Sequence, residues 1–305
     1  MGRLQSEDVS WIPRELPDLD TKIYVVDGAD FSVPANKGHE GMVYLTYIIE
    51  HYDNLPDVVL FFHPHQRAWH NNVLLNIDSA ETIRRLSSPH VIRQGYMNAR
   101  CHQDPGCPNW LHVDRSPWLY DREKKPEEPF LTSQIFHELH PGVPIPKAIS
   151  QPCCAQFAVS GERIRGRPRS AYIHYRDWLL NTDLTDETSG RIMEYTWQYL
   201  FSGQFEFCPS QAACYCDGYG ICFGGDAELN AWLRILNRRE VLDQKLVAMW
   251  DKGLMETEPY KTASAEQKEV DKMLFGLKDA AFHRGEDPRL RALDCGRQWE
   301  EGDGF

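Results

Sequence analysis

The sequence predicts an α/β fold with a mostly parallel sheet flanked by helices, followed by a helical C-terminal extension. Two runs indicate buried strands, a β-rich one over Lys22–Asp27 and a nearly all-apolar one over Asp57–Phe62. The stretch between them has helical spacing and a length that suits a crossover between parallel strands. A third observation is the change to long, charge-laced helical stretches beyond Gly225.

The first helix is expected over Glu40–Tyr52, where apolar residues recur at one-face spacing: Met42, Val43, Leu45, Ile48 and Ile49. A second helix is expected to begin next to Asp78, at a capping pattern, and to stop before Pro89. The segment 95–152 is rich in proline, histidine and tryptophan and has no clear period. Long loops of this kind usually carry function or cover a site.

A further buried strand is expected over Cys154–Val159. Ser160 follows it at the N-cap position of a long helix, which Pro168 must kink or split. Another helix, rich in aromatic residues, is expected over Ser189–Phe201.

The C-terminal part of the chain is expected to form helices over Ala227–Trp250 and Ala265–Phe282, joined by a polar linker. We therefore expect an α/β catalytic domain over residues 1–225 and a helical extension over 226–305 that packs on it.

Composition limits the function classes. The 305 residues include 45 acidic and 33 basic side chains, a formal net charge of -12, which argues against a protein that coats nucleic acid with its whole surface. The apolar run Val58–Phe62 is far shorter than the roughly 20 residues of a membrane-spanning helix, so no membrane partner is expected. The polar start of the chain predicts a cytoplasmic protein. The sequence leaves the oligomeric state open.

Nine cysteines are an odd count, and in a cytosolic chain thiols normally stay reduced, so a disulfide framework is not the first expectation. The Cys101 to Cys107 spacing favours buried thiols or a disulfide over zinc. The spacings within a second group do not match common zinc modules, so packing or disulfide closure is expected there: Cys208, Cys214, Cys216 and Cys222.

The first candidate site is the sequence N-K-G-H-E between the first strand and the helix. Asn36, Lys37 and the helix-start amides can receive an anion or a carbonyl oxygen, and Glu40 can act as a base or bind a cationic group. The alternative is structural: Asn36 caps the helix and Glu40 complements its dipole.

The second candidate site follows the most apolar strand, where His63, His65 and His70 lie within eight positions. A histidine there is a plausible general acid or base. No carboxylate lies at a matching short spacing, so metal binding is the weaker interpretation and no metal is expected.

Charged groups later in the chain complete the candidates. Arg163, Arg165, Arg167 and Arg169 alternate on an otherwise acidic chain and are the best candidates for phosphate contact, against a solvated helix face as the alternative. Glu194 has apolar neighbours that favour at least partial burial.

Several motifs occur in a fixed order: E-D-V-S-W from Glu7, N-K-G-H-E from Asn36, Y-L-T-Y-I-I-E-H-Y-D-N-L-P-D from Tyr44, N-A-R-C from Asn98 with P-G-C-P downstream, C-C-A-Q-F-A-V-S from Cys153, S-G-R-I-M-E-Y-T-W from Ser189 and C-Y-C-D-G-Y-G from Cys214. Over residues 7–224 the chain thereby resembles a mainly fungal domain family with an Asn-Leu-Arg-Cys signature, in which Ala99 here replaces the leucine. Within that family it resembles the arginine-containing cyclodipeptide synthases. The order of strands and helices also resembles the glycosyltransferase A-type fold, although His63-Pro64-His65 replaces the metal-binding Asp-x-Asp.

The resemblance implies an enzyme that makes cyclo-Arg-Xaa from arginyl-tRNA and a second aminoacyl-tRNA. Such ester substrates are already activated, and the chain lacks a Walker motif, so no cofactor is expected. The alternatives are a glycosyltransferase-like enzyme that uses a nucleotide sugar and a non-catalytic binding protein.

Each candidate residue has a role in this hypothesis. The catalytic candidates are His63, His65, Glu40 and Glu194. The substrate-binding candidates are Asn36, Lys37, His70, Asn98, Arg100, Gln156 and Tyr195. The tRNA-binding candidates are the four arginines Arg163, Arg165, Arg167 and Arg169.

Overall fold

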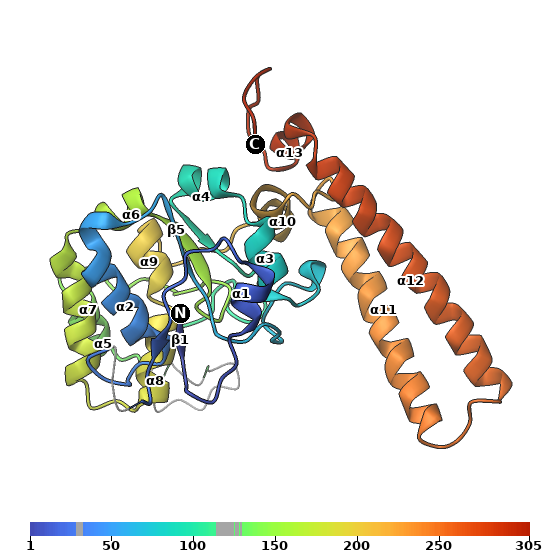
Figure 1. Ribbon diagram of the computed structural model, residues 1–305, viewed down its shortest axis with the longest axis horizontal. Coiled ribbons are helices and arrows are strands. Elements are labelled where there is room, and N and C mark those ends of the chain that lie inside the picture. The colour runs from blue at the N-terminus through green and yellow to red at the C-terminus, as the bar shows by residue number, and fades with distance from the viewer. Residues whose placement is uncertain (29–32, 114–124, 126–127, 129) are drawn as a thin grey trace. The chain divides into compact units, whose positions relative to one another are not determined.

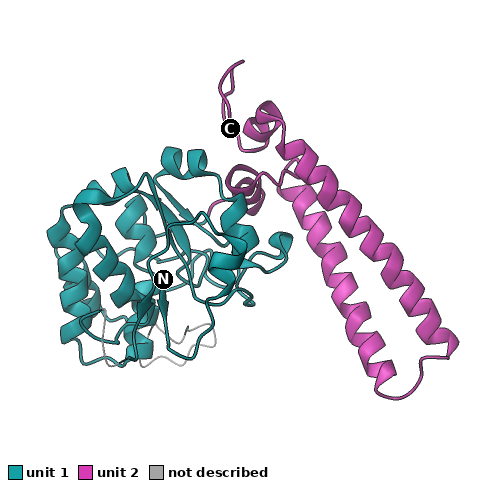
Figure 2. Ribbon diagram, in the orientation of Figure 1, with its two compact units in different colours: residues 1–208 teal, residues 209–305 magenta. Residues whose placement is uncertain are grey.

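The computed structural model describes residues 1–28, 33–113, 125, 128 and 130–305. The chain forms two compact units, Met1–Cys208 (unit 1) and Pro209–Phe305 (unit 2) (Figure 2). Helix α10 (Gln211–Tyr219) lies between this boundary and the one expected at residue 225, and it belongs to unit 2. Part of the irregular segment 95–152 lies outside the described residues.

The described residues of unit 1 form two small sheets. In the first, β1 (Gly2–Arg3) pairs with β2 (Tyr24–Val25) in parallel. The second is three-stranded, in the order β3 (Val58–Phe61), β5 (Phe157–Ser160), β4 (Tyr96–Asn98), and both of its pairings are antiparallel.

The prediction of a mostly parallel sheet was therefore wrong, although the fold is a mixed α/β one. All four residues of the central strand β5 are buried. A strand covered on both faces is apolar throughout whichever way its neighbours run, so its sequence carries no sign of direction. The helix after β2 also does not return the chain to a parallel neighbour, because β3 pairs with β5.

Helices surround the sheets, and α2, α5 and α7 lie side by side (Figure 1). In the described part of unit 1 the helices are α1 (Trp11–Glu15), α2 (Glu40–His51), α3 (Ser79–Arg85), α4 (Ser88–Gln94), α5 (Ser133–Leu139), α6 (Gly161–Arg165), α7 (Arg169–Asn181), α8 (Asp186–Glu194) and α9 (Trp197–Ser202), with 3-10 turns η1 (Tyr52–Asn54) and η2 (Val73–Leu75).

Several local predictions are confirmed. Helix α2 begins at Glu40, and the Asp78 side chain caps α3 by accepting a hydrogen bond from the Glu81 N–H. The Ser160 side chain caps α6, and Pro168 separates α6 from α7. Helix α4 was not predicted. It contains Pro89 in its first turn, a position where proline is tolerated because its missing N–H would have no partner in the helix.

The expected helix over Ser189–Phe201 is two helices, since the chain turns between Glu194 and Trp197. The turn places the C-terminus of α8 against the core of the unit. That core is aromatic: the Tyr44 ring contacts those of Phe61, Phe157 and Trp197 at centroid distances of 4.8, 5.7 and 5.8 Å.

Unit 2 contains α10, α11 (Asp226–Trp250), α12 (Glu258–Gly285) and α13 (Pro288–Asp294). Helices α11 and α12 form a long antiparallel hairpin, joined by the Trp232 indole N–H that donates to the Leu274 carbonyl at 3.0 Å. None of the helices in the described part of the chain combines the length and hydrophobicity needed to span a bilayer.

Disulfides join Cys107 to Cys208, Cys153 to Cys154 and Cys216 to Cys222. Cys107 thus pairs 101 residues away and does not close a loop with Cys101. Disulfide closure of the later cysteine group is confirmed for Cys216 and Cys222. The expectation of mainly reduced thiols was wrong for these pairs. The fold brings Cys107 and Cys208 together from distant positions, which no local spacing shows, whereas Cys153 and Cys154 are adjacent in the sequence.

Candidate functional site

One end of the three-stranded sheet gathers most of the candidate residues. Phe61 of β3 and Asn98 of β4 are both paired with Phe157 of β5. Since β5 is antiparallel to both neighbours, the residues after Phe61, after Asn98 and before Phe157 lie at the same end. We call this the site end.

His63 enters the site end directly after β3. Its backbone N–H donates to Oε1 of Gln156 at 3.1 Å, and the Gln156 amide donates to Oδ1 of Asn71 at 3.0 Å. Nδ1 of His63 lies 3.2 Å from Nε2 of His70. Burial, and then the neighbouring histidines, lower the pKa of His63 to about 3, so the ring is neutral at physiological pH.

Beside this pair lie Trp69 and Arg100. The Arg100 guanidinium is 5.1 Å from the centroid of the Trp69 ring. Arg100 is held by a hydrogen bond from its backbone N–H to Oδ1 of Asn98 at 2.9 Å and by one from its guanidinium to the Asp104 carbonyl at 2.8 Å. Burial, and then the Arg100 charge, lower the pKa of His70 to about 4.

His65 has a different environment. Its side chain is 58% exposed and its Nε2 lies 3.2 Å from Oε1 of Glu7. His65 is thus exposed beside Glu7, yet close enough to His63 and His70 for its charge to help lower the pKa of both.

The start of α2 supplies the second part of the site end. The Lys37 ammonium donates to the Thr182 carbonyl. The His39 N–H donates to Oδ1 of Asp186 at 3.1 Å, and its ring lies 3.5 Å from Oδ2 of the same carboxylate. Asn36 is exposed, and the residue at the N-cap is His39, so the alternative that Asn36 caps the helix was wrong.

Glu40 is the first residue of α2. A carboxylate at that position is normally stabilised by the helix dipole, which lowers its pKa. Here burial, and then the charge of Glu194, raise the pKa of Glu40 to about 8. Desolvation outweighs the dipole, so Glu40 carries a proton at neutral pH.

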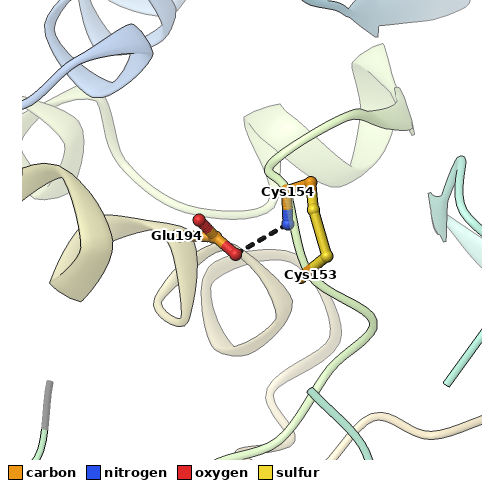
Figure 3. A group of neighbouring side chains, drawn as sticks. All are labelled: Cys153, Cys154 and Glu194. Atoms are coloured by element: carbon orange, nitrogen blue, oxygen red, sulfur yellow. Dashed lines mark hydrogen bonds between the residues drawn. A yellow bond between two sulfur atoms is a disulfide. The ribbon is translucent and has the colours of Figure 1, made fainter. Parts of the chain in front are cut away.

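Glu194, at the end of α8, is held by the segment before β5. Its Oε1 accepts a hydrogen bond from the Cys154 N–H at 2.7 Å, next to the disulfide between Cys153 and Cys154 (Figure 3). The Gln151 amide donates to the Glu194 carbonyl. Cys154 and Ala155 have φ angles of 85° and 45°, a region that non-glycine residues enter at a cost and that is common at functional sites.

Three buried side-chain atoms close to these groups have no hydrogen-bond partner among the described residues: Oη of Tyr44, Nε1 of Trp197 and Nε2 of His63. Tyr44 lies one helical turn after Glu40, and the Glu40 charge adds to the burial that raises the pKa of its hydroxyl well above 10. Buried polar atoms are normally paired, so these three stand out as unsatisfied among the described residues.

Sequence reasoning missed Tyr44 and Trp197 because aromatic residues at helical spacing usually belong to a core. The spacing of four between Glu40 and Tyr44 places both on one face of α2 and is a signal that could have found Tyr44. Tyr195 is buried, and its carbonyl accepts a hydrogen bond from the Gln198 amide at 2.8 Å.

The four candidate arginines lie at the other end of the sheet, because they follow Ser160, the last residue of β5. We call this the arginine end. Helix α2 reaches from one end to the other, since it starts at Glu40 and the Tyr52 ring that follows it packs against Arg169. Its 12 residues span about 18 Å.

Two of these arginines are held by the protein. The Arg167 guanidinium donates to the carbonyls of Leu200 and Tyr199 at 2.6 and 3.0 Å. Arg169 forms an ion pair with Asp53.

The other two are exposed. Arg163 donates to the Gln94 carbonyl at 3.4 Å. The arginine end can therefore offer Arg163 and Arg165 to an anion, at a distance from the site end.

Two groups of potential metal ligands each lie within 4.8 Å: Cys153, Cys154 and Glu194, and Cys216, Cys222 and Asp294. In each group the two sulfur atoms form a disulfide and are not thiolates, the form that binds a metal. Neither group fits a metal in this state.

The sequence profile of the family described as "Protein of unknown function (DUF3431)" matches residues 1–217, which is unit 1 and the beginning of unit 2. Searches of curated proteins and of solved structures gave no match.

Proposed function

The chain belongs to the family DUF3431, and we propose that this member of it is an aminoacyl-tRNA-dependent cyclodipeptide synthase that makes cyclo-Arg-Xaa. The observation that carries the proposal is the pair of acidic groups at the site end, in which the pKa of Glu40 is raised to about 8 by burial and by the charge of Glu194. Two carboxyl groups whose environments differ in this way can divide acid and base roles between them.

The chemistry requires two aminoacyl transfers. In each, an α-amine attacks an ester carbonyl, the C–N bond forms, the C–O bond to the ribose breaks, and the ribose oxygen leaves with a proton. The protonated Glu40 is the proposed donor of that proton. The Glu194 carboxylate accepts the first proton, which the α-ammonium must lose before it attacks, and passes it to solvent. The nitrogen loses a second proton as the amide forms, and this proton returns to Glu40 after Glu40 has protonated the ribose oxygen. Each transfer therefore releases one net proton and leaves both glutamates as they began.

The surroundings favour these roles over the histidine candidates. With a pKa of about 3, His63 is a weak base, and His65 points to Glu7. His63 and Tyr44 each present a buried polar atom that has no partner in the described part of the chain, and they are proposed to orient the ester. The carboxylates of Glu194 and of Asp186, which also acts on Glu40, suit a cationic arginine substrate.

The arginine repeat was expected to bind tRNA, but it does not lie at the site end, where the ester of the tRNA must react. Arg163 and Arg165 lie at the arginine end, so they can contact only a part of the tRNA distant from the reacting ester. At the site end the candidate cation is Arg100. Membership of the fungal arginine-containing subgroup and the likeness to the glycosyltransferase A-type fold are parts of this proposal.

The proposal places the protein in the cytoplasm, where aminoacyl-tRNA is found. Disulfides are rare in that compartment. Alkylation of free thiols in freshly broken cells, followed by mass spectrometry, tests this placement. In a reducing cytoplasm the disulfide between Cys107 and Cys208 would be open and both thiols would be alkylated. Complete pairing in cells, as in the structure, contradicts the cytoplasmic placement.

Product analysis tests the function directly. The full chain is expressed in a bacterium, and the medium is searched by mass spectrometry for cyclo-Arg-Xaa. Purified protein with aminoacyl-tRNA should make the same product, and ribonuclease should abolish it. Soluble protein that makes no such product overturns the proposal, and manganese-dependent hydrolysis of a sugar nucleotide would replace it with the glycosyltransferase alternative.

A further inference from the structure

We propose that Trp69, backed by Arg100, is a stacking platform for an unpaired nucleobase, and that this base is the one at the 3′ end of the aminoacylated RNA. The identity of the RNA rests on the proposed function, whereas the platform itself rests on the contacts of these two residues.

Trp69 is unusual in its exposure. It lies in the loop between β3 and η2, and 69% of its surface is open to solvent. Tryptophan is normally largely buried because its ring is the largest apolar group in proteins. An exposed indole next to buried titratable groups is what a planar ligand needs.

The exposed ring is nevertheless held in position. The Arg100 guanidinium lies 5.1 Å from the ring centroid, and Arg100 is itself only 8% exposed and hydrogen-bonded to Asp104 and Asn98. The His70 ring meets the indole edge to face, at 5.6 Å and 80°. A pre-oriented ring beside a fixed cation binds a base at a lower entropy cost than a mobile one.

The platform is connected to the reactive groups. Trp69 contacts His70, and Nε2 of His70 lies 3.2 Å from Nδ1 of His63, whose other nitrogen is buried and without a partner among the described residues. The terminal base and the aminoacyl ester of a charged RNA are joined through a single ribose. A base stacked on Trp69 would therefore bring the ester to the side of His63.

Binding of a labelled RNA hairpin that ends in single-stranded CCA tests the platform, with a blunt hairpin of the same stem as the reference probe. Trp69→Ala should weaken binding of the CCA hairpin by about 5- to 150-fold, the range for loss of one base–aromatic stack. Trp69→Phe, which keeps a smaller ring, should give an intermediate Kd. Binding of the blunt hairpin should not change in either variant.

The matched control is Trp250→Ala, because Trp250 of α11 is also exposed, at 61%, and belongs to unit 2. It should leave both affinities unchanged. Equal loss of affinity for the two hairpins in Trp69→Ala, or no loss for either, overturns the platform. Thermal unfolding of Trp69→Ala is measured alongside, and a midpoint close to the wild type is expected for so exposed a side chain.

The outcomes separate the two proposals. If the wild-type chain makes cyclo-Arg-Xaa but Trp69→Ala leaves the KM for aminoacyl-tRNA unchanged, the platform is wrong and the function stands. If the chain makes no cyclodipeptide yet binds the CCA hairpin through Trp69, the function is wrong and the platform stands.

Discussion

The two ends of the three-stranded sheet differ in how their charged groups are used. At the site end, Glu40 is half-buried beside the second negative charge of Glu194, and His63 and Tyr44 keep polar atoms without partners among the described residues. At the arginine end, Arg167 and Arg169 are bonded to carbonyl groups and to a carboxylate. Two of the four arginines in the dense cluster are thus held by the fold, whereas the proposed chemistry rests on the sparse group at the site end.

The difference shows that the proposed function rests on desolvated groups without a partner among the described residues, and not on charge density. A charged group that is already paired within the fold has its hydrogen bonds made and is not available to a ligand. A buried titratable group without a partner has a shifted pKa and can still form a hydrogen bond with a ligand. Four changes test whether the two ends differ in this way.

The largest expected effect is on catalysis at the site end. Glu40→Gln removes the proposed acid and keeps the shape of the side chain, so cyclodipeptide formation should fall by roughly 10²- to 10⁴-fold. The rate of product formation at saturating substrate is the measurement. Retention of more than a tenth of the activity in a folded Glu40→Gln protein would remove Glu40 from the mechanism.

The second effect is on stability at the arginine end. Arg167→Ala deprives the Leu200 and Tyr199 carbonyls of a donor and should lower the free energy of unfolding by about 1–3 kcal/mol. Urea denaturation measures this loss. Activity per folded molecule should be unchanged, and a strong loss of activity with full stability would show that the arginine end is functional after all.

The third effect is the pH dependence of stability at the site end. The pKa of Glu40 is about 8 in the folded protein against 4.5 for an ordinary glutamate, so the folded state holds this proton more tightly. The resulting stabilisation is fully present below pH 4.5 and is lost as pH rises through 8. Relative to Glu40→Gln, the wild type should therefore be less stable at pH 9 than at pH 6, as urea denaturation at both values would reveal. A constant difference between the two proteins would place Glu40 in solvent.

The smallest effect is expected for Arg165→Ala, because this side chain is exposed at the arginine end. Its free energy of unfolding should stay within about 0.5 kcal/mol of the wild type. The KM for aminoacyl-tRNA should also stay within a factor of two. A large, salt-dependent rise in KM would restore the arginine repeat as a tRNA contact.

Sequence reasoning found those parts of the fold whose causes are local. The start of α2, the Ser160 cap and the break at Pro168 depend on neighbouring residues only. The antiparallel order of the sheet was missed because the buried run of β5 is the same in either direction.

In the candidate site, too, residues with a local signal were found from the sequence, and residues whose partners are distant in the chain were not. Glu40 and His63 were found because polar residues at the ends of a helix and a strand are visible in sequence. The partners of Arg167 come from α9, more than 30 residues away, so no local pattern shows that this arginine is occupied. Trp197 was missed because an aromatic residue at helical spacing usually belongs to a core, and only the fold shows that its buried indole N–H has no partner among the described residues.

The protonation state of Glu40 tests the central claim most directly. The full chain is labelled with ¹³C at glutamate carboxyl groups, and Glu40 is assigned by its absence in Glu40→Gln. We predict that the Glu40 signal titrates with a pKa near 8. A pKa near the ordinary 4.5 would mean that the carboxyl group is solvated and charged at neutral pH, and it would contradict the account of the site end as the reactive end of this protein.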